Sequence, residues 1–238
     1  MGLPSTELQV VGPRLAHELR GYARRRDVVV LALRPGAVPL AAEVARSLQA
    51  PLDIFLVRPL VIAETQRLEI GAVASGGVLI LNPDVIKARA IPPATIARAA
   101  QAEARALDRR EREHRGEHAS PDLRHRMIVV VDDGRAGVAE LRMTVAALRR
   151  RWVQRVVLAA PTMAELACRQ LLREADEVVA ALTDDPPLAD GVWSDGGDEL
   201  APRETARLLR EAASGAARRL TLQPARLDLA PAEHARTS

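Results

Sequence analysis

The sequence predicts an α/β fold with a mostly parallel central sheet flanked by helices and a small hairpin element beside it. Three observations lead to this prediction. Short continuous runs of apolar residues, rich in valine, suit strands that are covered on both faces. Segments with helical periodicity separate these runs, and such alternation produces βαβ units. Hydrophobic residues make up 48% of the 238 positions, enough to fill one core of this kind.

The first half of the chain predicts two buried strands, two helices and a hairpin. Residues 9–22 carry apolar side chains at helical spacing. Strands are expected over 27–33 (DVVVLAL) and 52–57 (LDIFLV), with a helix over 38–49 between them. The runs IGAVA and VLIL lie on either side of Ser75-Gly76-Gly77, which is a hairpin signal, and Asn82-Pro83-Asp84 closes that hairpin.

The second half alternates more regularly. A long polar helix is expected over 95–114, with the charge run RRERE on its solvated face. Strands at 127–131, 153–160 and 176–182 then alternate with helices at 138–151, 163–173 and 203–213. We therefore expect one domain over residues 1–215 and a C-terminal tail over 216–238, where the periodicity is weak.

Composition excludes several classes of function. The 34 basic residues face 31 acidic ones and aromatic residues make up 2%, which argues against a nucleic-acid partner. The clusters Arg24–Arg26 and Arg149–Arg151 each precede a strand and are interpreted as solvated corners. A single cysteine, Cys168, rules out an internal disulfide. No signal peptide and no apolar run of about 20 residues is found, so a cytoplasmic protein without a membrane partner is expected.

One stretch carries chemistry. The apolar strand MIVVV ends in Asp132-Asp133-Gly134, and a helix begins a few residues later. Ligands of open α/β sheets bind at the carboxyl ends of strands, and a helix N-terminus attracts phosphate. Paired carboxylates suit the vicinal hydroxyls of a sugar or a hydrated Mg²⁺. Helix capping is the alternative, although one aspartate would suffice for that role.

These residues resemble the ribose-phosphate motif of type I phosphoribosyltransferases. More narrowly, the chain is similar to a group of bacterial phosphoribosyltransferase-domain proteins of unsettled substrate. The matching blocks occur in the same order and with similar spacing from about residue 10 to 205. They are VVVLALRPGAVPLAAEVA (28–45), VRPLV (57–61), IGAVASGG (70–77), RREREHRG (109–116), VDDGRAGVAELRMT (131–144), LAAP (158–161) and ADEVV (175–179).

The resemblance implies a transferase that uses phosphoribosyl pyrophosphate (PRPP) together with Mg²⁺. Asp132 and Asp133 would hold the ribose hydroxyls, and the following loop would hold the 5′-phosphate. The positions that align with ligand contacts of the family are Asp132, Asp133, Gly134, Arg135, Ala136, Gly137, Val138, Ala139, Glu140, Arg34, Gly36, Ala37 and Arg58. The acceptor is not specified, and a homodimer is expected because dimers are common in this fold.

The phosphate loop departs from the pattern of the family, which reads Gly-Ile-Ala-Thr-Gly-Ala-Thr. Here Gly137 and Glu140 replace its two threonines, and Val138 replaces its second glycine. A β-branched residue disfavours positive φ and blocks close approach of the backbone. Glu140 also places a carboxylate where the resemblance puts a phosphate, and the two charges repel.

The pyrophosphate loop differs as well. The Pro-Arg-Gly-Gly of the family aligns with Arg34-Pro35-Gly36-Ala37, and Arg-Lys aligns with Arg58-Pro59. A PRPP-dependent transferase is therefore one hypothesis. A catalytically impaired protein that binds a nucleotide or sugar phosphate on the same scaffold is the alternative. Trp193 would either stack on a base at the mouth of the cleft or, as we expect, pack the last loop.

Overall fold

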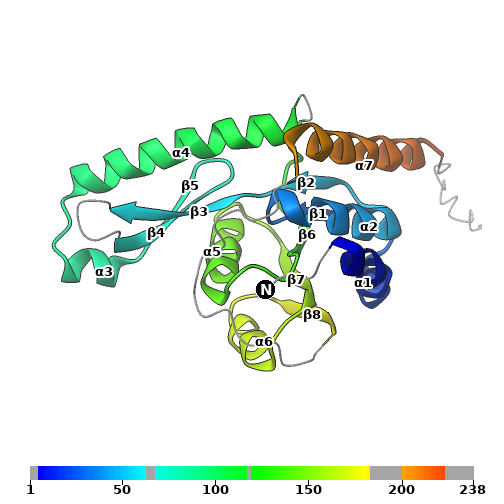
Figure 1. The fold of residues 1–238 in the computed structure, drawn as a ribbon, viewed down its shortest axis with the longest axis horizontal. Coiled ribbons are helices and arrows are strands. Elements are labelled where there is room, and N and C mark those ends of the chain that lie inside the picture. Colours follow the sequence, from blue (N-terminus) through cyan, green and yellow to red (C-terminus); the bar gives the residue numbers. More distant parts are fainter. Residues whose placement is uncertain (1–4, 63–67, 117–118, 183–199, 223–238) are drawn as a thin grey trace, which may run out of the picture.

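The computed structural model describes residues 5–62, 68–116, 119–182 and 200–222. A parallel five-stranded sheet in the order β2-β1-β6-β7-β8 forms its centre (Figure 1). The strands are β1 (Val28–Ala32), β2 (Leu52–Ile54), β6 (Met127–Val131), β7 (Arg155–Thr162) and β8 (Glu177–Leu182). All four neighbouring pairs run parallel, as the alternation of strands and helices predicts.

The central strands are buried on both faces, which explains their unbroken apolar sequences. Every residue of β1 and β6 is buried. Val28, Val30 and Ala32 point into one hydrophobic cluster, whereas Val29 and Leu31 point into another on the opposite face. Successive side chains of a strand alternate between faces, so one valine-rich run supplies both clusters.

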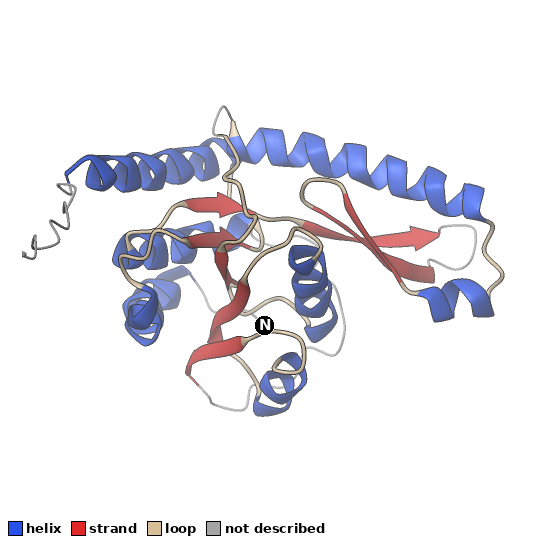
Figure 2. Ribbon diagram, turned by 180° about the vertical axis from the view of Figure 1, so that it is seen from behind, coloured by secondary structure: helices blue, strands red, loops and turns tan. Residues whose placement is uncertain are grey.

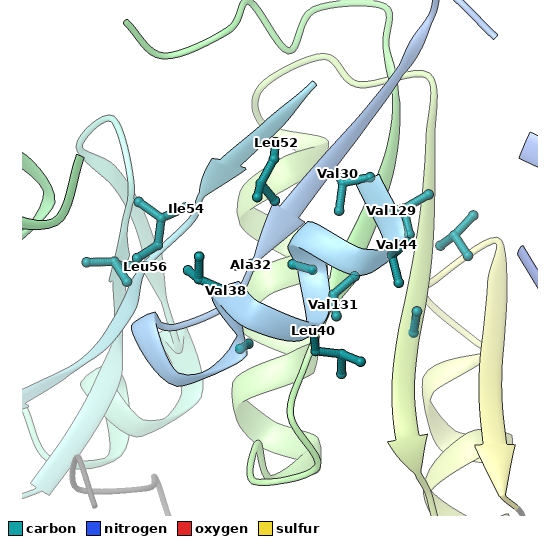
Figure 3. Close-up of a cluster of buried hydrophobic side chains, with 14 of the residues drawn as sticks. Val30, Ala32, Val38, Leu40, Val44, Leu52, Ile54, Leu56, Val129 and Val131 are labelled. Atoms are coloured by element: carbon teal, nitrogen blue, oxygen red, sulfur yellow. The ribbon is translucent and has the colours of Figure 1, made fainter. Parts of the chain in front are cut away.

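Helices cover each face of the sheet. On one side lie α1 (Ser5–Glu18), with the 3₁₀ turn η1 (Leu19–Tyr22), α2 (Val38–Leu48) and α7 (Pro202–Leu222). Figure 3 shows Val38, Leu40 and Val44 of α2 against the valines of β1 and β6. On the other side lie α5 (Val138–Arg149) and α6 (Glu165–Leu171). The molecule is thus a three-layer α/β domain.

A second, antiparallel sheet extends from the body of the domain. It contains β3 (Val57–Ile62), β4 (Leu68–Ala74) and β5 (Val78–Leu81). Figures 1 and 2 show it lying beneath α4 (Pro93–Arg115), with α3 (Pro83–Ala88) at its far end. Gly71 allows β4 and β5 to pair here, because a Cβ atom at this position would lie 2.0 Å from the Ile80 carbonyl oxygen. The hairpin prediction is confirmed, and a third strand enlarges it.

Several boundaries differ from the sequence-based prediction. The single strand expected over 52–57 is wrong: β2 ends at Ile54, and Val57 begins β3 in the other sheet. Asn82, expected only to close the hairpin, also caps α3, because its side chain accepts a hydrogen bond from the Val85 N–H. Helix α7 continues to Leu222, beyond the expected end near residue 213. No helix among the described residues is long and apolar enough to cross a membrane.

Candidate functional site

The candidate site lies at the carboxyl ends of β1 and β6, which are neighbours in the sheet. The Leu33 N–H donates to the Val131 carbonyl at 3.0 Å, so the pairing of β1 with β6 continues one residue beyond the end of β1. Arg34 follows Leu33 directly, and Asp132 and Asp133 follow Val131. Two segments about 100 residues apart in sequence thereby bring charged side chains to one edge, as the position of the Asp-Asp pair predicts.

Arg34 is surrounded by three carboxylates. Its Nη2 donates a hydrogen bond to Glu140 Oε1 at 2.9 Å and lies 3.6 Å from Asp132 Oδ1. Its Nε lies 3.7 Å from Asp133 Oδ1. The side chains are withdrawn from solvent: 15% of Arg34 is exposed, 8% of Glu140 and 3% of Asp132. The guanidinium that the resemblance assigns to a pyrophosphate is therefore bound by carboxylates of the protein itself.

Asp132 organises the loop that follows it. Its Oδ2 accepts a hydrogen bond from the Gly134 N–H at 2.8 Å, and both of its carboxylate oxygens accept from the Ala136 N–H at 3.2–3.3 Å. Gly134 has φ of 85°, which side chains rarely adopt, so glycine is required for this turn. Two backbone N–H groups of the loop are thus already satisfied by an aspartate.

Helix α5 begins immediately after this loop. Gly137 is its N-cap and offers no side chain to accept a hydrogen bond from the first turn. Val138 is the first helical residue, and its φ is not positive. The conflict expected from a β-branched residue is therefore avoided, because the helix starts where the family has a glycine. Glu140 lies in the first turn and projects to Arg34 instead of to solvent.

Burial changes the protonation chemistry of the cluster. Burial raises the pKa of Glu140 to about 7, and the ionised Asp132 and Asp133 add to the shift while Arg34 opposes it. Burial and the neighbouring Asp133 likewise raise the pKa of Asp132 to about 6, again against Arg34. Burial alone would lower the pKa of Arg34, but the three carboxylates outweigh it and raise that pKa. The arginine stays charged, while Glu140 and Asp132 titrate near neutral pH.

Three buried polar atoms of the cluster make no hydrogen bond with the described residues. They are Arg34 Nε, Asp133 Oδ1 and Glu140 Oε2. Buried polar atoms normally have partners, so such atoms at the end of a parallel sheet indicate a place for a polar ligand. Two of the three are acceptors and suit a ligand that donates hydrogen bonds.

The remaining predicted residues lie at different distances from this cluster. Arg135 Nε lies 3.8 Å from Asp133 Oδ2, at the edge of the cluster. Gly36 and Ala37 belong to the 3₁₀ turn η2 (Pro35–Ala37) directly after Arg34. Arg58 lies on β3, where its Nε pairs with Glu103 of α4 at 3.0 Å. Trp193 is outside the described residues.

The sequence did not reveal a second buried ion-pair network, which joins α4 to the sheet. Arg115 Nε donates to Asp53 Oδ1 at 2.9 Å, and its Nη1 donates to Glu111 Oε2 at 3.4 Å. Ser120 donates to the other oxygen of Asp53 at 2.8 Å. Glu111 is buried, so the solvated face expected for RRERE is wrong at this position. The only signal was the block RREREHRG, whose charges repeat at helical i, i+4 spacing.

Among the described residues, no group of three or more histidine, cysteine, aspartate or glutamate side chains is arranged to hold a metal ion. Asp132, Asp133 and Glu140 converge on Arg34 instead.

Comparison with known proteins gives relatives by sequence and by fold. No protein-family model matches the chain. The chain is 38% identical over 173 residues to "Putative phosphoribosyl transferase Rv0571c" of Mycobacterium tuberculosis strain H37Rv. The corresponding protein MT0597 of strain CDC 1551, which carries the same description, matches equally. These matches cover 72% of the chain and 39% of each relative, so the chain spans about two fifths of their length.

A solved structure supports the fold. The protein TT1426 from Thermus thermophilus superposes with a TM-score of 0.70 at 29% identity, covering 86% of this chain and 96% of that one. The matching blocks of sequence described above form the parallel sheet and the added antiparallel sheet of this structure. One of these blocks places the Asp-Asp pair at the end of β6. By sequence and by fold, the chain is a type I phosphoribosyltransferase-domain protein.

Proposed function

We propose that this protein is a catalytically impaired phosphoribosyltransferase-fold protein that binds a nucleotide or sugar phosphate weakly, mainly through its sugar. The observation that carries the proposal is the ion pair between Arg34 and Glu140 at 2.9 Å. In this arrangement a carboxylate of α5 takes the place of a phosphate on Arg34. The pair joins the segment that the resemblance assigns to pyrophosphate, which contains Arg34, to the segment that it assigns to the 5′-phosphate, which contains Glu140.

The charge of the cluster opposes a phosphate. When all groups are ionised, three carboxylates face two guanidinium groups, Arg34 and Arg135, so negative charge is in excess. With an effective dielectric constant of about 20, a carboxylate about 4 Å from a phosphate charge costs roughly 4 kcal/mol. The loop offers little compensation, because Asp132 already accepts the N–H groups of Gly134 and Ala136.

The cluster suits a sugar better than a phosphate. Asp133 Oδ1 and Glu140 Oε2 are buried acceptors without a partner among the described residues. A vicinal diol of ribose carries two O–H donors that match such acceptors. Asp133 would then bind a ribose hydroxyl directly, and Asp132 would hold the loop in place.

An active PRPP-dependent transferase is the second candidate. It is favoured by the buried Asp132-Asp133 pair and by the first turn of α5, where no side chain caps the helix. In that reaction the pair would orient the ribose, and the helix N-terminus would hold the 5′-phosphate. Mg²⁺ bound to PRPP would neutralise the leaving pyrophosphate. Arg34 would first have to leave Glu140 before it could contact the pyrophosphate.

Calorimetric titration of the purified protein with PRPP, with and without Mg²⁺, distinguishes the two candidates. The impaired protein should give weak binding, and Asp132→Asn/Asp133→Asn should abolish it. Tight Mg²⁺-dependent binding, followed by release of pyrophosphate when acceptor bases are added, would overturn the proposal and establish the transferase.

A further inference from the structure

The edge of the sheet opposite the candidate site collects the arginine clusters of the chain. Because all five strands run parallel, the segments that precede them lie together at the amino ends of the strands. The segments before β1, β6 and β7 are neighbours, since these strands are adjacent in the sheet. We call residues 24–27, 122–126 and 149–155 the arginine edge. Clusters that look like separate solvated corners in the sequence are therefore parts of one surface.

Backbone and side-chain hydrogen bonds join the three segments directly. Arg126 donates from Nη1 to the Arg26 carbonyl at 2.5 Å. The His125 N–H donates to the Trp152 carbonyl at 2.8 Å, and the Gln154 N–H donates to the Arg126 carbonyl at 2.8 Å. The surface is thus continuous from the segment before β1 to the segment before β7.

The arginine edge is strongly positive. It contains nine arginines and two aspartates, although the whole chain has a net charge of only +3, so the rest of the molecule is net negative. Asp176 and Glu177, at the start of β8, pair with Arg149 and Arg155 and weaken the charge at that end. Within the described part of the chain, no carboxylate forms a salt bridge with Arg24, Arg26 or Arg150, which are all exposed.

A tryptophan lies within this positive surface. Trp152 is 73% exposed, although tryptophan is usually well buried. It also has φ of 56°, and Arg24 and His125 in the adjoining segments have φ of 61° and 57°. Bulky side chains rarely adopt this left-handed conformation, which glycine would adopt without strain. The fold therefore provides no packing reason for a tryptophan at this place.

We infer that the arginine edge binds single-stranded nucleic acid, with phosphates on Arg24, Arg26 and Arg126 and a base stacked on Trp152. A positive groove or edge with an exposed aromatic side chain is the combination that such ligands require. The low aromatic content of the chain does not oppose this, because one well-placed ring provides one stacking platform. The edge lies at the opposite end of the strands from Arg34 and Asp132, so this binding is independent of the proposed function.

The test measures fluorescence anisotropy of labelled oligouridylate and oligothymidylate of about 16 nucleotides, the upper range of such sites, with the full chain. Wild type should bind at low salt, and binding should quench the fluorescence of Trp152. Trp152→Ala should weaken binding about tenfold, as loss of one stacked base does. Leu166→Ala, which removes another exposed apolar side chain, is the matched control and should have no effect.

The arginines are tested through salt dependence. Arg24→Ala/Arg26→Ala should reduce the slope of log affinity against log salt by about 1.4, since each phosphate contact to a single strand contributes about 0.7. Arg105→Ala/Arg109→Ala on the exposed face of α4 should leave the slope unchanged. Preference for RNA over DNA would add a 2′-hydroxyl contact, and equal binding would indicate phosphates and stacking alone; both agree with the inference.

Three outcomes would overturn it. The first is no binding of either oligonucleotide at low salt. The second is binding that Trp152→Ala and Arg24→Ala/Arg26→Ala weaken no more than their controls do. The third is tighter binding of duplex than of single strands, because a duplex cannot present an unstacked base to Trp152.

Discussion

Replacing Glu140 with glutamine removes one of the three carboxylates around Arg34 and keeps an oxygen that can accept its hydrogen bond. In the folded protein burial raises the pKa of Glu140 from 4.5 to about 7. This difference corresponds to about 3 kcal/mol, since one pKa unit is worth about 1.4 kcal/mol. Because the folded-state value is the higher one, the folded state binds the proton more tightly than the unfolded chain.

The sign of the pH dependence follows from that difference. The contribution of Glu140 to stability is fully present below pH 4.5, is lost as pH rises towards 7, and stays absent above that pH. Glu140→Gln cannot ionise and should avoid this loss. The substitution should therefore stabilise the protein by up to about 3 kcal/mol at pH 8 and have little effect near pH 4.5. Asp132 titrates over part of the same range, and its charge contributes to the raised pKa of Glu140, so the difference between the two proteins reports the loss of the Glu140 charge together with its effect on Asp132.

Urea denaturation of both proteins between pH 4.5 and pH 8.5 measures this difference. Glu113→Gln, on an exposed position of α4, is the matched control and should change stability by less than about 0.5 kcal/mol at every pH. If Glu140→Gln were instead less stable than wild type at pH 8, the ion pair with Arg34 would be a net source of stability. The explanation of the site as an electrostatically strained cluster would then be refuted.

Three further substitutions test the fold by chemical denaturation, one in the loop of the site and two elsewhere in the domain. Arg115→Met should destabilise the protein by about 3–5 kcal/mol, because it leaves Asp53 buried with an uncompensated charge; a loss below about 1 kcal/mol would contradict this. Gly134→Ala should lower the free energy of unfolding by about 1–2 kcal/mol, because residue 134 has a φ of 85°. An unchanged denaturation midpoint would mean that the turn relaxes to accommodate alanine. Gly71→Ala should cost about 3 kcal/mol, because its Cβ would lie 2.0 Å from the Ile80 carbonyl oxygen, and wild-type stability would disprove the close approach of β4 and β5.

The parallel sheet could be predicted from the sequence because strands that are buried on both faces have continuous apolar sequences. The valine runs of β1 and β6 have no polar position, and helical periodicity separates the strands. The Asp-Asp pair could be placed at a strand end for the same reason. The split between β2 and β3 could not be predicted, because LDIFLVRPLVI is apolar almost throughout and the change of sheet occurs within it.

The most informative contact of the site also could not be predicted. Arg34 and Glu140 are 106 residues apart, and the sequence places each of them at a ligand-contact position without pairing them. Only the adjacency of β1 and β6 brings them together. The same holds for the arginine edge, since sheet order decides that the segments before β1, β6 and β7 are neighbours.

The central claim, that Glu140 closes the phosphate loop, is tested most directly by restoring the threonine of the family. Calorimetric titration with PRPP and Mg²⁺ would compare wild type, Glu140→Thr, and Glu165→Thr in the exposed first turn of α6 as the control. We expect Glu140→Thr to bind at least about tenfold more tightly than wild type, since removal of the repulsion is worth more than about 1.4 kcal/mol. If Glu140→Thr binds PRPP no more tightly than wild type does, the claim is contradicted. Tight binding of PRPP by wild type itself would contradict it as well.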